Sequence, residues 1–188
     1  MTKIFNRRIA LFILILFVLP FILTAKEKVL KNKYGTYTLD KEKGVFQSKT
    51  GNFTIVIEYN KKSDLYIVEM KGKTTGYIAL GFGRSKEMKD SEIILGYVKN
   101  GETFLLHEYG TGLYRHEPIQ EKEKYIKLLN SEEKDGWTFI KFSRPARIKG
   151  EKYKILQSGQ TIEILYSLGA ADAFKKHMER GYIPIILP

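Results

Sequence analysis

The sequence predicts an all-β domain, an antiparallel β-sandwich of about ten strands. Short runs rich in β-branched and aromatic residues recur along the chain. Turn signals such as Gly51-Asn52, Asn100-Gly101 and Asp135-Gly136 separate these runs. No long amphipathic helical pattern competes with them, although one or two helical turns could form over residues 170–179.

Individual strands follow from alternation and from their turn boundaries. The clearest is Phe53 to Tyr59, in which every second residue is apolar. We expect strands over Gly44–Ser48, Phe53–Tyr59, Leu65–Lys71, Gly76–Gly83, Glu92–Val98, Thr103–Tyr109, Ile126–Leu129, Trp137–Ser143, Thr161–Ser167 and Tyr182–Leu187.

The stretch from Gly76 to Gly101 organises the domain. Its first strand is apolar on both faces, with Tyr77 and Ala79 on one side and Phe82 on the other, so both faces should be buried. A polar loop follows the strand and carries one apolar residue, Met88. The Met88 thioether either packs against the core or is a soft metal ligand. As a metal ligand, it would be an axial ligand of a haem iron.

The first 25 residues predict an export signal. Lys3, Arg7 and Arg8 precede an apolar run from Ile9 to Leu23 that is short for a membrane span. The residues before Ala25 suggest cleavage there, and an uncleaved membrane anchor is the alternative. Either way the domain is expected outside the cytoplasm, with residues 26–35 as a linker and 36–188 as the folded domain.

Composition excludes several classes of chemistry. The chain of 188 residues has no cysteine, which rules out disulfides, thiolate metal sites, iron–sulfur clusters and covalently attached haem. The formal net charge of +11 is spread along the chain and favours encounter with an acidic partner. No recognised nucleic-acid motif accompanies the charge, so no nucleic-acid partner is expected.

The histidines do not define a hydrolytic or zinc site. His107 and His116 lack a companion carboxylate at a usual zinc spacing, and no H-E-x-x-H or G-x-S-x-G motif is present. His177 lies between two late strands, where binding residues often occur. From the residues alone it is a ligand or a solvent-facing loop histidine, and Met178 is a ligand or a packing residue.

Taken together, four blocks of sequence resemble the DOMON domain family. They occur in the family's order, and the resemblance covers essentially residues 36–187. The blocks are Gly76-Tyr-Ile-Ala-Leu-Gly-Phe-Gly83, Met88-Lys-Asp-Ser-Glu-Ile-Ile-Leu-Gly-Tyr-Val98 with Asn100-Gly101, Asp135-Gly-Trp-Thr-Phe-Ile-Lys-Phe-Ser-Arg-Pro145 and His177-Met-Glu-Arg-Gly181.

This resemblance implies a sandwich of immunoglobulin-like topology that binds either haem or sugars. In the haem-binding branch, which includes the cytochrome domain of cellobiose dehydrogenase, one methionine and one histidine hold a b-type haem. Met88 and His177 match those two positions. Some related domains hold haem with a methionine and a lysine, so Lys175 and Lys176 are alternative ligand candidates to His177.

Other residues are candidates for the haem surroundings. Phe82, Tyr97 and Tyr109 are expected wall residues, or else ordinary core aromatics. The arginines Arg84 and Arg180 could pair with haem propionates, whereas Arg144 beside Pro145 is expected to be structural. The segment from His107 to Gly112 departs from the family pattern, with Glu108 in place of an aspartate, which leaves the pocket edge open.

The leading hypothesis is an exported b-type cytochrome domain, binding haem b without a covalent bond and relaying single electrons to a redox partner protein. The net charge favours an acidic partner. The alternative is a haem-free module that binds a carbohydrate or a protein at the cell envelope, favoured by the twelve tyrosines. A catalytic role is less favoured, because no nucleophile or acid–base pair stands out. The N-terminal segment leaves contact with a membrane open.

Overall fold

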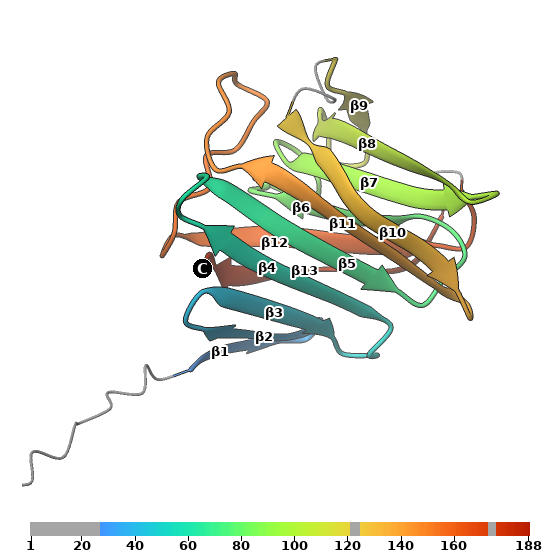
Figure 1. Cartoon of the computed structure of the whole chain (residues 1–188), viewed down its shortest axis with the longest axis horizontal. Helices are drawn as coiled ribbons and strands as arrows, with labels where there is room; N and C mark the ends of the chain where they lie inside the picture. The colour runs from blue at the N-terminus through green and yellow to red at the C-terminus, as the bar shows by residue number, and fades with distance from the viewer. Residues whose placement is uncertain (1–26, 121–124, 173–175) are drawn as a thin grey trace, which may run out of the picture.

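The computed structural model describes residues 27–120, 125–172 and 176–188, which form thirteen strands in two antiparallel sheets (Figure 1). The first sheet has the order β1-β2-β3-β4-β5-β11-β10, with bounds Lys28–Asn32, Gly35–Asp40, Lys43–Ser48, Phe53–Asn60, Leu65–Gly72, Trp137–Pro145 and Lys127–Lys134. The second has the order β13-β12-β6-β7-β8-β9, with bounds His177–Ile186, Thr161–Gly169, Ile78–Phe82, Glu92–Lys99, Glu102–Gly110 and His116–Pro118.

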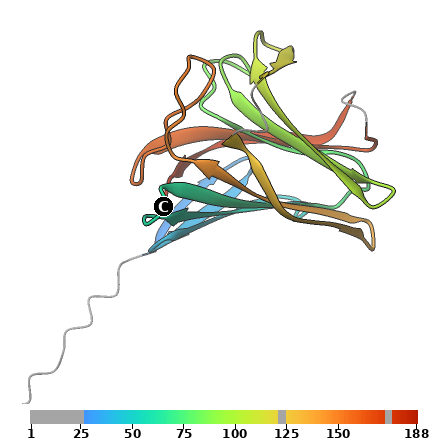
Figure 2. The same cartoon turned by 45° about the horizontal axis from the view of Figure 1, so that its top comes forward.

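The two sheets pack face to face as a sandwich, which confirms the predicted fold class (Figure 2). The main core lies between them and contains Phe46, Phe53, Phe82, Phe142 and Tyr166. These side chains come from strands of both sheets, so the hydrophobic effect holds the two layers together.

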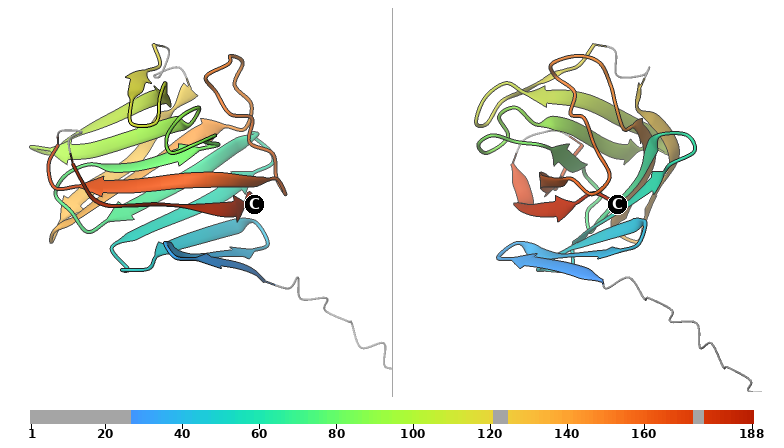
Figure 3. Two further views of the ribbon diagram at one scale, coloured as in Figure 1. Left: turned by 180° about the vertical axis from the view of Figure 1, so that it is seen from behind. Right: turned by 90° about the vertical axis from the view of Figure 1, so that its left-hand side faces the viewer.

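The second sheet also buries apolar residues on its outer face. Seen from behind in Figure 3, this sheet presents β13, β12, β6 and β7 side by side. A second cluster, here called the outer cluster, consists of buried Tyr77, Ala79, Ile93 and Leu95 with half-buried Met88, Tyr97 and Leu106 packed against them. Strand β6 is therefore buried on both faces, as its sequence predicts.

Three strands lie where none was predicted, namely β1, β2 and β9. Strand β1 falls within the segment predicted as a linker and pairs antiparallel with β2. Its lysine-rich sequence hides this role because β1 is an edge strand with mostly exposed residues.

Strand β13 begins five residues earlier than predicted, at His177 rather than Tyr182. Residues 177–179 are strand and not helical turn, and Gly169 of β12 pairs with His177 across a register shift. Exposed Met178 and Arg180 alternate here with half-buried His177 and Glu179, and the half-buried residues are polar, so the apolar pattern of a strand is missing.

The expected export signal, residues 1–25, lies outside the described residues. Within the described part of the chain, no helix has the length and apolar character needed to span a bilayer.

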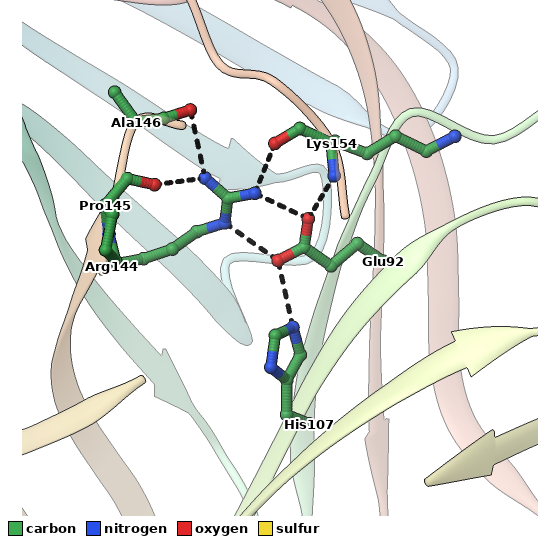
Figure 4. A network of polar contacts seen from close by, with 6 residues as sticks. All are labelled: Glu92, His107, Arg144, Pro145, Ala146 and Lys154. Atoms are coloured by element: carbon green, nitrogen blue, oxygen red, sulfur yellow. Dashed lines mark hydrogen bonds and ion pairs between the residues drawn. The ribbon is translucent and has the colours of Figure 1, made fainter. Parts of the chain in front are cut away.

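A buried polar network ties the two sheets together near the start of β7 (Figure 4). Arg144 of β11 donates from Nε and Nη2 to the two carboxylate oxygens of Glu92, at 2.8 Å and 2.6 Å. His107 Nε2 lies 2.9 Å from Glu92 Oε1, and the backbone N–H of Lys154 donates to Oε2 at 2.6 Å. Arg144 also donates to the carbonyls of Pro145 and Lys154, so it is structural, as expected.

The carboxylate in this network stays ionised although it is buried. Burial raises the pKa of Glu92, but the hydrogen bonds and charge interactions with His107 and Arg144 together outweigh burial and lower the pKa to about 2. The charge of Arg144 is thereby matched inside the sandwich, and the network fixes the strand that follows the Met88 loop.

Candidate functional site

An apolar pocket of about 230 Å³ lies on the outer face of the second sheet. Its floor comes from β6, β7 and β12, and its walls come from the loop between β6 and β7, the segment before β9, and β13. It is lined by Tyr77, Ala79, Glu87, Met88, Ile93, Leu95, Leu113, Tyr114, His116, Leu165, Tyr166, Ser167, His177, Arg180, Gly181 and Tyr182.

Met88 reaches this pocket from the tightly turned loop between β6 and β7. The residues Glu87 and Asp90 on either side have positive φ angles of 50° and 64°. The Met88 carbonyl accepts from the backbone N–H of Ser91 at 3.1 Å, and the Met88 N–H donates to Leu113 at 3.4 Å. The loop thus places an apolar side chain against the outer cluster, while its residues Ser85, Lys86 and Lys89 are exposed.

Asp90 fixes the end of the same loop. The Ser85 hydroxyl donates to Asp90 at 2.5 Å and Tyr109 donates at 3.2 Å, while the Asp90 N–H donates to the Gly110 carbonyl at 2.8 Å. The hydrogen bond from Ser85 is the main cause that lowers the pKa of Asp90. Tyr109 therefore stabilises the end of the Met88 loop through its hydrogen bond to Asp90.

His177 enters the pocket from the start of β13. Its Nδ1 lies 2.5 Å from the hydroxyl oxygen of Tyr77, and the two rings meet edge to face with centroids 6.1 Å apart. Burial lowers the pKa of His177, and the charges of Arg180 and His116 lower it further. These effects favour neutral imidazole, the form that can bind a metal through a ring nitrogen.

A second histidine lines the same pocket. His116 belongs to the short edge strand β9, and its Nδ1 is hydrogen-bonded to the carboxylate of Glu108. Because Glu108 is buried, its carboxylate is held in place, and the hydrogen bond to it orients the His116 ring. His107, by contrast, lies in the Glu92 network and not in the pocket.

The structure brings three of the seven predicted site residues together in this pocket: Met88, His177 and Arg180. Tyr97 packs against the outer cluster but does not line the pocket. The other three, Phe82, Arg84 and Tyr109, lie elsewhere.

Strand parity explains the place of Phe82. Successive side chains of a strand point to opposite faces, so Phe82 shares a face with Ile78 and Leu80 and lies in the main core, fully buried. Tyr77 and Ala79 have the opposite parity and line the pocket. The predicted wall aromatic therefore stands on the wrong side of β6.

Arg84 is engaged beside the pocket rather than in it. Its guanidinium is paired with Glu163 and stacks on the ring of Tyr182, 3.7 Å from the centroid. Lys176 is exposed next to His177, while Lys175 lies outside the described residues.

Sequence reasoning missed Tyr77, His116, Leu165 and Ser167 as pocket residues. The alternation of β6 is the signal for Tyr77, since it predicts a second buried face. No comparable signal marks the other three, because only the pairing of β12 with β6 and of β9 with β8 brings them near Met88.

The fold and the pocket define a class of protein: an antiparallel β-sandwich that carries an apolar pocket on the outer face of one sheet. The DOMON domain family matches residues 49–169, and the chain belongs to this family.

One relative is similar in sequence over part of the chain. The chain is 22% identical over 116 residues to MOXD1 homolog 2 of Drosophila melanogaster, a match that covers 62% of this chain and 15% of that protein. The chain thus spans only a small part of that relative's length.

Two solved structures are similar in fold. The cytochrome b domain of pyranose dehydrogenase from Coprinopsis cinerea superposes with a TM-score of 0.62 at 13% identity, over 86% of this chain and 88% of that one. The cytochrome domain of cellobiose dehydrogenase from Myriococcum thermophilum gives 0.56 at 12% identity, with the same coverage of both chains. At these identities the likeness establishes the fold.

Proposed function

We propose that this domain binds haem b without a covalent bond, with Met88 and His177 as axial ligands, and relays single electrons. One observation carries the proposal: two residues 89 positions apart in the sequence, a thioether and an imidazole, line one apolar pocket. Apart from the Tyr77 contact at Nδ1, no hydrogen bond to the His177 ring is present among the described residues, which leaves Nε2 for the iron.

The residues that line the pocket fit a haem group. The floor residues Ala79, Ile93, Leu95 and Leu165 offer an apolar surface for a flat macrocycle. Arg180 lines the pocket and is exposed, so it can pair with a propionate carboxylate at the mouth. The two solved structures of similar fold are both cytochrome domains, which supports the choice of haem.

The ligand set supports electron transfer rather than oxygen activation. Haem iron with both axial positions filled supplies reversible one-electron transfer, and a methionine ligand raises its reduction potential. Met88 contributes a soft neutral sulfur, and His177 contributes a neutral nitrogen whose orientation is fixed by Tyr77.

The surroundings of the pocket favour an acidic redox partner. Exposed cations lie on two bordering segments, with Lys86 and Lys89 before β7 and Lys176 before β13. Exposed Tyr114 and Met178 add apolar contact area, with 71% and 59% of their surfaces accessible. The domain would meet such a partner outside the cytoplasm, either secreted or held at a membrane by residues 1–25.

A visible spectrum of the domain supplied with haem, oxidised and then reduced with dithionite, tests the proposal. Sharp, split α and β bands on reduction are expected for low-spin haem with two axial ligands. Absence of haem uptake would contradict the proposal and would favour a binding module for a carbohydrate or a protein, to be examined on a glycan array.

A further inference from the structure

We propose that Tyr77 is the positioning residue of the site: its phenol oxygen accepts a hydrogen bond from Nδ1–H of His177 and so directs Nε2 into the pocket. This inference rests on the proposed function for its consequence at iron. The geometry itself, a Tyr77 oxygen 2.5 Å from His177 Nδ1, is a property of the protein alone.

The position of Tyr77 is fixed from two sides. Its side chain is 1% exposed and belongs to the outer cluster. Its carbonyl accepts from the backbone N–H of Gly169, and a Cβ at Gly169 would lie 2.0 Å from the Tyr77 ring. The Tyr77 ring therefore packs directly on the backbone of Gly169, and Gly169 is the β12 residue that pairs with His177.

The direction of the hydrogen bond follows from the proposed role of His177 as a ligand. A neutral imidazole carries one proton, and a ligating nitrogen must carry none, so Nδ1 holds the proton and donates it to Tyr77. Ser167, which also lines the pocket, forms a side-chain hydrogen bond with the Tyr77 hydroxyl. The Tyr77 hydroxyl therefore contacts both His177 and Ser167.

The consequence is a pre-oriented ligand. An imidazole ring can rotate about its side-chain bonds and can bind through either nitrogen, and a fixed acceptor at Nδ1 removes both freedoms. Loss of such a partner typically reduces metal affinity by about 10- to 100-fold. Removing the acceptor also reduces electron donation by the imidazole, so the reduction potential should rise.

The first experiment uses the haem-free protein, so that its readout does not require bound haem. Nitrogen chemical shifts of His177, measured by NMR near neutral pH, report which ring nitrogen carries the proton. The inference requires a proton on Nδ1 in the wild type and a mixture of both tautomers in Tyr77→Phe. A proton on Nε2 in the wild type would overturn it.

The second experiment titrates haemin into Tyr77→Phe, with Tyr97→Phe as the matched control from the same outer cluster. We expect at least a tenfold weaker affinity and a higher potential in Tyr77→Phe, with both values close to wild type in Tyr97→Phe. Equal affinity and potential in Tyr77→Phe and the wild type would overturn the positioning role. Failure of the wild type itself to bind haemin would refute the proposed function and the role at iron, while leaving the tautomer result standing.

Discussion

Arg144 and Glu92 face each other between the two sheets, both with 0% of the side chain exposed. The contact is bidentate, with N–O distances of 2.8 Å and 2.6 Å. Because Arg144 lies on β11 and Glu92 on β7, this ion pair joins the two sheets of the sandwich.

Replacing one partner of this pair should destabilise the fold strongly. Arg144→Met leaves the carboxylate of Glu92 buried without its main counter-charge, and breaking a buried pair typically costs about 3–5 kcal/mol. Lys141→Met on the same strand is the control, because Lys141 pairs with Glu69 in a partly exposed position, at 2.8 Å, where such pairs contribute about 1 kcal/mol or less. Urea unfolding measures both, and equal losses would contradict this assignment.

The same pair predicts acid sensitivity. The pKa of Glu92 is about 2 in the folded protein against an ordinary value of 4.5, so its stabilising contribution is present above pH 4.5. It disappears as the pH falls from about 4.5 to about 2, because the unfolded chain takes up the proton first.

Unfolding free energies of the wild type and Glu92→Gln, measured from pH 6 down to pH 2, check this pH dependence. The difference between the two proteins should shrink as the pH falls. A difference that stays constant over this range would mean that Glu92 does not titrate between the two values. Glu69→Gln serves as the partly exposed comparison.

Met88 can be tested by a substitution of similar volume. Met88→Leu keeps an apolar side chain against the outer cluster, so the fold should remain intact, with a loss of less than about 1.5 kcal/mol. The thioether is lost, so the haem spectrum should change from low-spin to high-spin. Met178→Leu is the control because Met178 is 59% exposed on β13. A low-spin spectrum in Met88→Leu would rule out Met88 as an axial ligand.

Two glycines near the Met88 loop form another matched pair. A Cβ at Gly110 would lie 1.8 Å from the carbonyl oxygen of Met88, whereas a Cβ at Gly112 meets only the Arg115 Cβ at 3.6 Å. Gly110→Ala should therefore displace the loop, lowering both the melting temperature and the affinity for haem. Gly112→Ala should alter stability by no more than about 0.5 kcal/mol. Similar behaviour of the two variants would show that the loop adapts freely.

Part of the site was accessible from the sequence. The lone apolar residue in a polar loop singled out Met88, and the match of His177-Met-Glu-Arg-Gly181 to a family element singled out His177. The structure places both residues, with Arg180, in one pocket. The aromatic walls are less predictable: Phe82 is close to the loop in sequence, but side chains of a strand alternate between its faces, and the Phe82 side chain lies in the main core.

The sequence by itself determined the β-sandwich, most of its strands and the double burial of β6, since these depend on the local alternation of side chains and on turn residues. Only the tertiary structure decided which strands became neighbours. Pairing of β12 with β6 and β13 brings Ser167 and His177 to Tyr77, and pairing of β8 with β9 brings His116 to Glu108. Such contacts join residues up to 100 positions apart, and they depend on sheet order and register, which no local pattern in the chain encodes.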